Sequence, residues 1–220
     1  TGLSSEAENV MVVLGDTPLL DALVLTEMRD LFKSKNCDVL VSTAHLEDPF
    51  GYGRIVRDEN EIIKQIVEEK DCDDAQKTID ECNMYPFVFK REFLEVALDK
   101  LDTNNAQGEQ YLTDVVTIAR ESSKGVSSYT YINAHVARGV NDREQLAELE
   151  KIMRDTINAE HMKNGVTMID PATTYIDAEV TIENDVTILP GTMISGKSVI
   201  GSGCIIGPNT RSIDSTIGSN

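Results

Sequence analysis

The sequence predicts an α/β domain, followed by a long helix and then a parallel β-helix. Three observations support this fold class. Apolar runs alternate with amphipathic helical stretches over about residues 10–140, a helical pattern covers about 142–163, and isoleucines then recur every six residues. A period of six fits neither a helix nor a flat strand and is typical of stacked coils. We expect domains at 1–141 and 166–220, joined by a rigid connector helix at 142–165.

Each six-residue rung of the repeat carries one large apolar side chain and one small one. The isoleucines are Ile176, Ile182, Ile188, Ile194, Ile200 and Ile206, and the small or β-branched residues four positions later are Val180, Val186, Thr192, Ser198, Cys204 and Thr210. Turn residues such as Pro190-Gly191 and Gly196-Lys197 separate the rungs. Chance clustering in an ordinary β domain is the alternative, and six consecutive isoleucines argue against it. If three rungs complete one coil, this segment holds about two coils.

Within the α/β domain, the apolar patterns predict a largely parallel sheet with helices between its strands. Strands are expected at Val10–Leu14, which reads as fully buried, at Asp38–Thr43 and at Ser127–Ile132, with a hairpin formed by Ile55–Arg57 and Ile62–Val67. Helices are expected from Pro18 onward, at Arg91–Leu101 and at Leu112–Ser123. In the connector helix, Asn141 is the predicted N-cap and Gly165 follows the last turn.

Charge and composition exclude several classes of function. The chain has 220 residues, is 40% hydrophobic and carries a net charge of −18, from 38 acidic and 20 basic side chains. Such a charge opposes binding to nucleic acid or to anionic lipid, so an anionic substrate would require a metal ion. No apolar run is long enough for a membrane span. A first residue other than methionine leads us to expect a piece of a longer protein.

The four cysteines predict the compartment. Cys37, Cys72, Cys82 and Cys204 include no Cys-x-x-Cys pair, and Cys204 falls on a small inward position of the repeat. We interpret them as reduced thiols, which indicates the cytoplasm.

Asp16 is the first candidate for chemistry. Leu14-Gly15-Asp16 follows the first predicted strand, at the edge where open α/β sheets bind ligands. A carboxylate there can hold Mg²⁺ against nucleotide phosphates, and Gly15 lets a ligand approach the backbone closely. The alternative is that Asp16 only caps a turn or the next helix.

Three further segments carry polar or glycine-rich patterns. Pro49–Arg54 is a glycine-spaced loop suited to a flat ligand, or else a tight turn into the hairpin. Asn104–Asp114 is rich in amides that can read sugar hydroxyls or an N-acetyl group, or else form a polar loop before a helix. In Gly139–Arg143, Asn141 can donate a neutral oxygen to the same cation as Asp16, serve as a helix cap, or do both.

Taken in order, these motifs resemble one family over the whole chain. The segments are GDTPL, DPFGYGRI, IVEEKD, NNAQGEQYLTD, GVNDR and NGVTMIDPATTYID before the repeat. They are similar to the bacterial bifunctional enzyme with an N-terminal uridylyltransferase and a C-terminal acetyltransferase. The resemblance implies a Rossmann-like nucleotidyltransferase domain and the start of a left-handed β-helix of hexapeptides. It also implies that the glycine-rich nucleotide loop precedes Thr1 and that most of the β-helix follows Asn220.

The resemblance also implies roles for individual residues. Asp16 and Asn141 would bind Mg²⁺, Leu14 and Gly15 would line the nucleotide, and Gly53, Glu68 and Asn83 would contact the amino sugar. The implied reaction joins UTP and N-acetylglucosamine 1-phosphate into UDP-N-acetylglucosamine and releases pyrophosphate, with no protein nucleophile or base. The full-length family also acetylates glucosamine 1-phosphate from acetyl-CoA and forms homotrimers. His45, His135 and His161 all precede the repeat, so none is a candidate acetyltransferase base.

One departure from the family pattern concerns the sugar pocket. Met84 and Tyr85 follow Asn83 where the family has a small hydroxyl residue and glycine. We expect Tyr85 to crowd the pocket or to redirect the chain, which leaves the roles of Glu81 and Asn83 open. Two other functions remain as hypotheses: another sugar-1-phosphate nucleotidyltransferase, and a non-catalytic oligomerisation and binding module. Metal-dependent binding of a sugar nucleotide separates the enzyme from the module.

Overall fold

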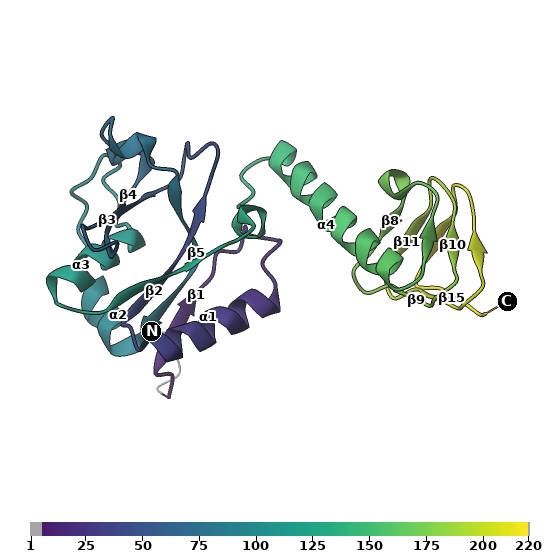
Figure 1. Ribbon diagram of the computed structural model, residues 1–220, viewed down its shortest axis with the longest axis horizontal. Coiled ribbons are helices and arrows are strands. Elements are labelled where there is room, and N and C mark those ends of the chain that lie inside the picture. The colour runs from purple at the N-terminus through teal and green to yellow at the C-terminus, as the bar shows by residue number, and fades with distance from the viewer. Residues whose placement is uncertain (1–5, 220) are drawn as a thin grey trace. The chain divides into compact units, whose positions relative to one another are not determined.

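The chain divides into two compact units, Thr1–Val140 and Asn141–Asn220, each with its own hydrophobic core (Figure 1). A computed structural model describes residues 6–219. The long helix that the sequence predicts as a connector groups with the second unit. The two units are described separately below.

The first unit is built on a six-stranded mixed sheet. Its strands are β1 (Asn9–Val12), β2 (Val39–His45), β3 (Arg54–Arg57), β4 (Ile63–Val67), β5 (Glu81–Lys90) and β6 (Val126–Thr130). The strand order is β4-β3-β5-β2-β6, and β1 also pairs with β5. Only the β2–β6 pairing is parallel, and the other four described pairings are antiparallel. The α/β class is confirmed, whereas the expectation of a largely parallel sheet is wrong.

Strand β5 is central to the sheet, and the sequence patterns did not predict it. It pairs with β1, β2 and β3 and contains Pro86. Proline has no backbone N–H, which disfavours it inside a sheet. Here the β2–β5 register shifts between Leu40 and Ser42, and the Ser42 hydroxyl donates to the Pro86 carbonyl at 2.7 Å. The irregularity accommodates the proline within the strand.

Helices cover both faces of this sheet (Figure 1). The helices are α1 (Ala22–Lys35), α2 (Arg91–Leu98) and α3 (Val115–Glu121), with the short 3₁₀ helices η1 (Glu69–Asp71), η2 (Gln76–Thr78), η3 (Leu112–Asp114) and η4 (Ala134–Ala137). Side chains of α2 and α3 pack with Phe87 and Phe89 of β5. On the opposite face, Met28 and Phe32 of α1 pack with Val88. The side chains of β5 therefore alternate between two cores.

Two predicted boundaries near the start of the chain need correction. Helix α1 begins at Ala22 rather than at Pro18, because Asp21 is the N-cap and its carboxylate accepts from the Val24 N–H at 2.9 Å. Strand β1 is half-buried rather than fully buried. Among the described strands it pairs with β5 alone.

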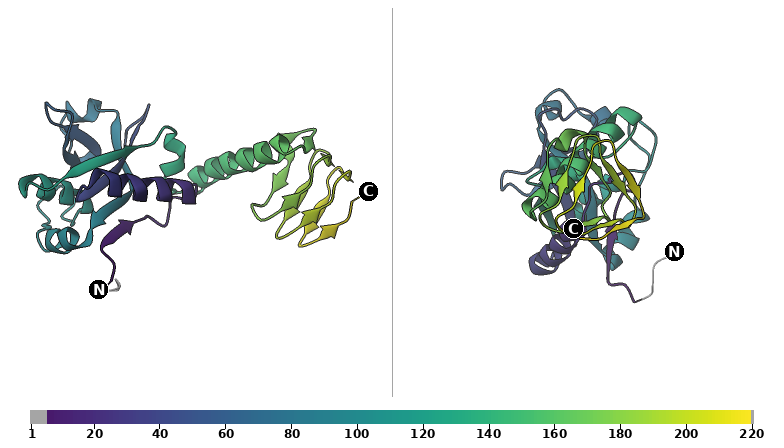
Figure 2. Two further views of the ribbon diagram at one scale, coloured as in Figure 1. Left: turned by 60° about the horizontal axis from the view of Figure 1, so that its bottom comes forward. Right: turned by 90° about the vertical axis from the view of Figure 1, so that its right-hand side faces the viewer.

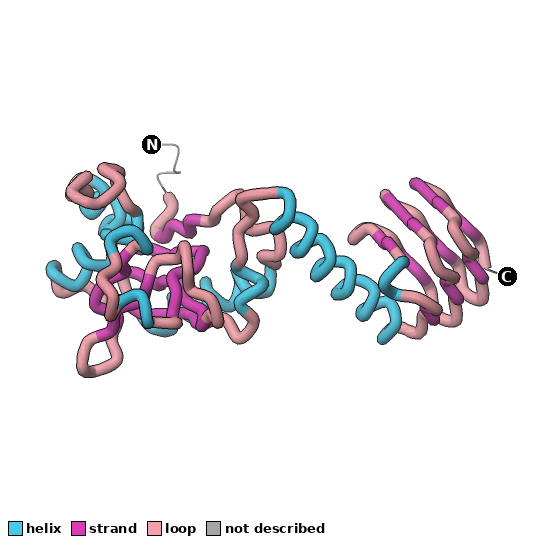
Figure 3. The backbone as a smooth tube through the Cα atoms, turned by 90° about the horizontal axis from the view of Figure 1, so that it is seen from above, coloured by secondary structure: helices cyan, strands magenta, loops and turns pink. Residues whose placement is uncertain are grey.

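The second unit consists of a helix and three short parallel sheets. Its elements are α4 (Arg143–Lys163), β7 (Thr167–Met168), η5 (Pro171–Thr173), β8 (Tyr175–Ile176), β9 (Thr181–Ile182), β10 (Thr187–Ile188), β11 (Met193–Ser195), β12 (Val199–Ile200), β13 (Ile205–Ile206), β14 (Arg211–Ile213) and β15 (Thr216–Ile217). The sheets have the orders β13-β10-β7, β14-β11-β8 and β15-β12-β9. Ile188 pairs with Ile206, eighteen residues later, so three hexapeptides form one coil (Figures 2 and 3).

The isoleucine repeat forms the core of this coil, as the sequence predicts. Ile188, Ile194 and Ile200 are fully buried, and Ile176, Ile182 and Ile206 are at most 8% exposed. The small positions between them are also buried, from Val180 to Cys204. Several turns need a left-handed backbone, with φ of 60° at Asp185, 75° at Gly191 and 56° at Asn209. The predicted β-helix of hexapeptides is confirmed.

Helix α4 packs against the coil of its own unit. Its N-cap is Asp142 rather than Asn141, because the Asp142 carboxylate accepts from the Gln145 N–H at 2.8 Å. Ile157 lies against the isoleucine core, and the buried Asn158 side chain donates to two carbonyls of the first coil at 3.0 Å. No helix within residues 6–219 combines the length and apolar character needed to cross a membrane.

Candidate functional site

The first predicted site residues follow β1 directly. Leu14, Gly15 and Asp16 are all exposed. The turn is held at both ends, because the Thr17 hydroxyl donates to the Leu14 carbonyl at 3.0 Å and the Asp16 carbonyl accepts from the Val140 N–H at 2.9 Å. Asp16 does not cap α1, since Asp21 has that role. Its carboxylate therefore remains available to a ligand.

The Asp16 carboxylate faces the segment that precedes Asn141. A Cβ placed on Gly139 would lie 3.3 Å from Asp16 Oδ2, so this glycine allows the carboxylate to approach the backbone. Asn141 follows Val140 directly in the chain and is exposed, and its backbone N–H donates to the Gln145 side-chain oxygen at 2.7 Å. We call Asp16, Gly139 and Val140 the Asp16 cluster.

The Asp16 cluster offers a carboxylate, which is a type of ligand that Mg²⁺ prefers. Mg²⁺ prefers oxygen ligands and is commonly bound by one or two carboxylates, several waters and substrate phosphates. The carboxylate of Asp16 matches that pattern. Within residues 6–219 there is no group of three or more His, Cys, Asp or Glu side chains able to hold a metal. A cation here would complete its shell with water and phosphate oxygens.

A second group of predicted residues converges around Gly53. A Cβ on Gly53 would lie 3.3 Å from Glu68 Oε2 and 3.5 Å from the Asn83 Cβ, and the Asn83 N–H donates to the Gly53 carbonyl at 2.7 Å. The buried Thr113 hydroxyl donates to Glu68 Oε1 at 2.7 Å. We call Gly53, Glu68, Asn83 and Thr113 the Glu68 cluster. Its residues come from four separate segments of the chain.

Asn83 presents an unused acceptor in this cluster. The residue is 8% exposed, and its Oδ1 is buried without a hydrogen-bond partner among the described residues. A buried acceptor without a partner is unfavourable, and a bound ligand with a hydroxyl or an amide N–H would satisfy it. Thr113 was not predicted as a site residue. Its position two residues after Tyr111 in the amide-rich motif gave no indication that it contacts Glu68.

Glu69 and Arg54 hold the glycine-spaced loop in place. Glu69 Oε2 accepts from Arg54 Nη2 at 2.6 Å and from the Gly51 N–H at 3.2 Å, and Arg54 Nη1 also donates to the Tyr52 carbonyl. The Arg54 guanidinium lowers the pKa of Glu69, so the ion pair is favoured at neutral pH. The loop is a tight turn, with φ of 86° at Gly51, and it also delivers Gly53 to the Glu68 cluster.

Tyr85 lies two residues after Asn83 on β5. It is half-buried and makes an edge contact with Phe87, with ring centroids 4.9 Å apart. Burial, then the nearby charges of Glu68 and Asp16, raise the pKa of Tyr85 to about 12, so the phenol keeps its proton. No hydrogen bond joins the Tyr85 hydroxyl to another residue in the described part of the chain.

The amide-rich segment mostly stabilises its own loop. Asn105 Oδ1 accepts from the backbone of Gln107 and Glu109 at 3.2 Å each, and the Gln110 side chain donates to the Leu101 carbonyl at 3.1 Å. The Gln107 amide bonds with Lys70 and Tyr111, both at 2.7 Å. These bonds fit the loop interpretation for Asn105, Gln107 and Gln110, and the alternative that the amides read a sugar stays a prediction.

Glu81 does not belong to the Glu68 cluster. Its carboxylate accepts two bonds from Arg57, at 2.8 Å from Nε and 2.6 Å from Nη2. Burial opposes ionisation of Glu81, but the bonds from Arg57 outweigh it and lower the pKa of the carboxyl. Glu81 thus has a structural role in joining β3 to β5.

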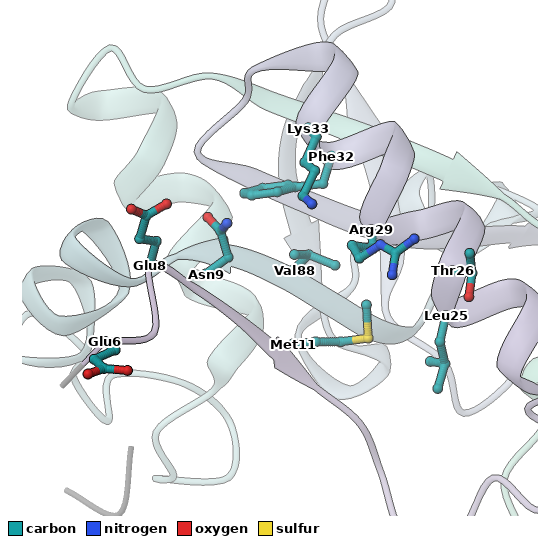
Figure 4. Close-up of a pocket in the computed structure, with 10 residues that line it drawn as sticks. All are labelled: Glu6, Glu8, Asn9, Met11, Leu25, Thr26, Arg29, Phe32, Lys33 and Val88. Carbon is teal, nitrogen blue, oxygen red and sulfur yellow. The ribbon is translucent and has the colours of Figure 1, made fainter. Parts of the chain in front are cut away.

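A cavity of about 600 Å³ lies away from these residues, between β1 and α1 (Figure 4). Its walls include Met11 from β1, Val88 from β5, and Arg29, Phe32 and Lys33 from α1. Val88 points to the opposite face of β5 from Tyr85, so the cavity and the two clusters lie on different sides of the sheet. None of the predicted site residues lines it.

The remaining candidate groups have ordinary roles. His45 bonds with Asp80 at 3.1 Å, and burial lowers the pKa of His161 on α4. Cys37, Cys72, Cys82 and Cys204 are all buried and free. Burial raises the pKa of Cys82 to about 11, which makes this thiol unreactive.

Comparison with known proteins identifies both units. The nucleotidyl transferase family matches residues 2–134, and the family described as bacterial transferase hexapeptide (six repeats) matches 179–211. The chain is 46% identical to the bifunctional protein GlmU of Enterococcus faecalis, over 99% of this chain and 47% of that protein. It is also 46% identical to the same-named protein of Thermoanaerobacter pseudethanolicus, over 98% of this chain and 47% of that protein.

The chain spans about half the length of the curated relatives it matches. A solved structure titled apo UDP-glucose pyrophosphorylase aligns with a TM-score of 0.43 and 19% identity, over 56% of this chain and 46% of that one. The nucleotidyl transferase match covers more than half of the chain, and the motif-based resemblance to the bifunctional enzyme is confirmed. The chain belongs to the nucleotidyl transferase family and carries a segment of the bacterial hexapeptide transferases after it.

Proposed function

We propose that this chain acts in UDP-N-acetylglucosamine synthesis, by Mg²⁺-dependent transfer of UMP from UTP to N-acetylglucosamine 1-phosphate. The observation that carries the proposal is the convergence of predicted residues in one unit. Asp16 lies against the segment that leads to Asn141. Gly53, Glu68 and Asn83 lie together, and the buried Asn83 Oδ1 has no hydrogen-bond partner among the described residues. The similarity to the bifunctional protein GlmU supports the same activity.

Each cluster has a part in the proposed reaction. Leu14 and Gly15 line the nucleotide, while Gly53, Glu68 and Asn83 bind the amino sugar. Asp16 and Asn141 hold Mg²⁺, which would supply charge neutralisation to the phosphates when bound. An oxygen of the sugar 1-phosphate forms a bond to the α-phosphorus of UTP, and the bond to pyrophosphate breaks. The protein positions the substrates and contributes no nucleophile or base.

The wider biology of the protein is also a proposal. Acetylation of glucosamine 1-phosphate from acetyl-CoA would belong to the longer protein, since residues 166–220 contain no histidine to act as a base. The hexapeptide match supports assembly into a homotrimer. The four free thiols support a cytoplasmic location.

Substitution of Asp16 tests the metal and nucleotide part of this function. We expect the 220-residue chain to bind UDP-N-acetylglucosamine saturably in calorimetry, only when Mg²⁺ is present. Asp16→Ala removes the carboxylate ligand and should abolish this metal-dependent binding. Asp74→Ala, at another exposed aspartate, is the matched control and should bind normally.

The same titrations separate the alternative functions. Failure of the unaltered chain to bind at millimolar ligand would overturn the proposal and favour a non-catalytic oligomerisation module. Tighter binding of a different nucleotide sugar would favour another sugar-1-phosphate nucleotidyltransferase. Full binding by Asp16→Ala would contradict the assigned metal ligand.

Substitution of Gly53 tests the sugar contacts. An added methyl group would lie 3.0 Å from Ile66 Cγ2 and 3.3 Å from Glu68 Oε2, so the Glu68 carboxylate must move. We expect Gly53→Ala to weaken UDP-N-acetylglucosamine about tenfold, the effect of losing one hydrogen bond to a charged group. Gly218→Ala, where nothing lies within 4 Å of the added group, is the control. Unchanged affinity in Gly53→Ala would remove Gly53 from the sugar site.

A further inference from the structure

Tyr85 lies on β5, the strand that carries Asn83 of the Glu68 cluster and pairs with β1, which leads to the Asp16 cluster. Asn83, Tyr85 and Phe87 alternate along β5 and share one face of the sheet. At one end of this row, Asn83 belongs to the Glu68 cluster. At the other end, Phe87 pairs with Val12, after which the chain turns into the Asp16 cluster. The charges of Glu68 and Asp16 both act on the Tyr85 hydroxyl, which therefore lies near both clusters.

A nucleotide sugar bound as proposed extends from the Glu68 cluster to the Asp16 cluster, past Tyr85. Its sugar ring would lie at the Glu68 cluster and its metal-bound phosphates at the Asp16 cluster. The group that joins the two is the phosphate on the sugar C1 atom. Glu68 and Asp16 are both negatively charged, so a phosphate between them needs a donor besides the cation.

We propose that Tyr85 is a specificity-determining residue whose hydroxyl donates a hydrogen bond to the sugar-linked phosphate. This inference rests on the proposed function. The Tyr85 ring is fixed by its edge contact with Phe87, and its backbone carbonyl accepts from the Tyr131 hydroxyl at 2.9 Å. The Tyr85 hydroxyl itself bonds to no other described residue, so it is available to a ligand. A phenol that retains its proton acts as a donor to phosphate without adding negative charge.

This role predicts a particular selectivity among ligands. UDP-N-acetylglucosamine contains the sugar-linked phosphate, whereas UMP lacks it. Removing the phenol oxygen should therefore weaken the first ligand and leave the second unaffected. A purely structural role for Tyr85 would change both affinities together, through the stability or shape of the site.

The test compares Tyr85→Phe with the unaltered chain by calorimetry in the presence of Mg²⁺. We expect Tyr85→Phe to bind UDP-N-acetylglucosamine about tenfold more weakly, because one hydrogen bond to a charged group is lost. Binding of UMP and the thermal unfolding midpoint should not change. Tyr129→Phe is the matched control, since its hydroxyl bonds to Glu27 at 2.7 Å on the α1 side of the sheet.

A second variant distinguishes a donor from a steric plug. Tyr85→Gly removes both ring and hydroxyl and should weaken UDP-N-acetylglucosamine at least as much as Tyr85→Phe does. Tighter binding by Tyr85→Gly would mean that the ring only blocks the pocket and would overturn the inference. So would equal binding by Tyr85→Phe and the unaltered chain, with the proposed function left intact. If the unaltered chain binds no UDP-N-acetylglucosamine, the proposed function fails and this inference fails with it.

Discussion

Replacing Ile194 by alanine should destabilise the coil of the second unit by about 3 kcal/mol, the usual effect of emptying a buried isoleucine site. Ile194 is fully buried and lies in the middle row of its sheet, paired with Ile176 on one side and Ser212 on the other. Both neighbouring rungs hold it in register, so the coil has little freedom to close around the cavity. The loss should fall on the coil rather than on the first unit.

Hydrogen exchange measured by mass spectrometry can locate this loss. Peptides from residues 166–219 should exchange faster in Ile194→Ala, while peptides from the β5 sheet keep their protection. The matched control is Met193→Ala, one residue earlier, where the side chain is 42% exposed and points outward. It should change stability by no more than about 0.5 kcal/mol. Equal losses in the two variants would show that the isoleucine column is not the core of the coil.

The coil was predictable because its register is local. Each rung repeats one pattern of large, small and turn residues, and successive rungs stack on one another in chain order. Six isoleucines at a fixed spacing therefore define the inward positions without any knowledge of distant contacts. The structure buries all six, with Ile188, Ile194 and Ile200 at 0% exposure.

The sheet of the first unit was harder to predict, because strand direction depends on distant partners. A strand buried on both faces shows a continuous apolar run whether its neighbour is parallel or antiparallel. The sequence of β2 therefore does not reveal that its neighbour β5 is antiparallel. The sequence patterns did not predict the central strand β5, which contains Pro86, a residue type that is rare inside sheets. Only the register shift opposite Ser42 reveals how the strand tolerates that proline.

The candidate site was predictable as a set of positions but not as a set of contacts. Motifs singled out Asp16, Gly53, Glu68 and Asn83, whose assigned roles stay predictions. The bond from Thr113 to Glu68 depends on how η3 packs beside β4, and the place of Tyr85 depends on how β5 pairs with β1, which no motif encodes. The amides of Asn104–Asp114 stay ambiguous for a different reason: the same side chains that suit a sugar also suit a turn.

The Arg57–Glu81 ion pair should make the first unit sensitive to acid. Arg57 binds Glu81 through two nitrogens and also donates to the Glu61 carbonyl and to Ser128, so it links β3 with β5 and β6. Glu81→Gln leaves a neutral partner for a partly buried guanidinium. We expect it to lower the free energy of unfolding at pH 7 by about 2 kcal/mol, less than for a fully buried pair because the Arg57 side chain is 24% exposed.

The pH dependence of this difference follows from the lowered pKa of Glu81. A carboxyl whose pKa is lower in the folded state contributes full stability above its unfolded pKa, near 4.5, and loses it as the pH falls through the folded value. The gap between the unaltered chain and Glu81→Gln should therefore stay constant from pH 7 to about 5 and shrink below that. Tyrosine fluorescence during urea unfolding can measure the free energy of unfolding of the first unit. The chain lacks tryptophan, and only Tyr175 of its six tyrosines lies in the second unit.

An exposed ion pair provides the comparison that isolates this effect. Arg29 and Asp30 are 2.9 Å apart, but their side chains are 56% and 60% exposed, so water screens their attraction. Asp30→Asn should leave the stability of the first unit nearly unchanged at every pH. A gap between the unaltered chain and Glu81→Gln that persists undiminished to pH 3 would contradict a charge-based role. The missing stability would then come from packing around the glutamate side chain, since protonation would no longer remove what the substitution removes.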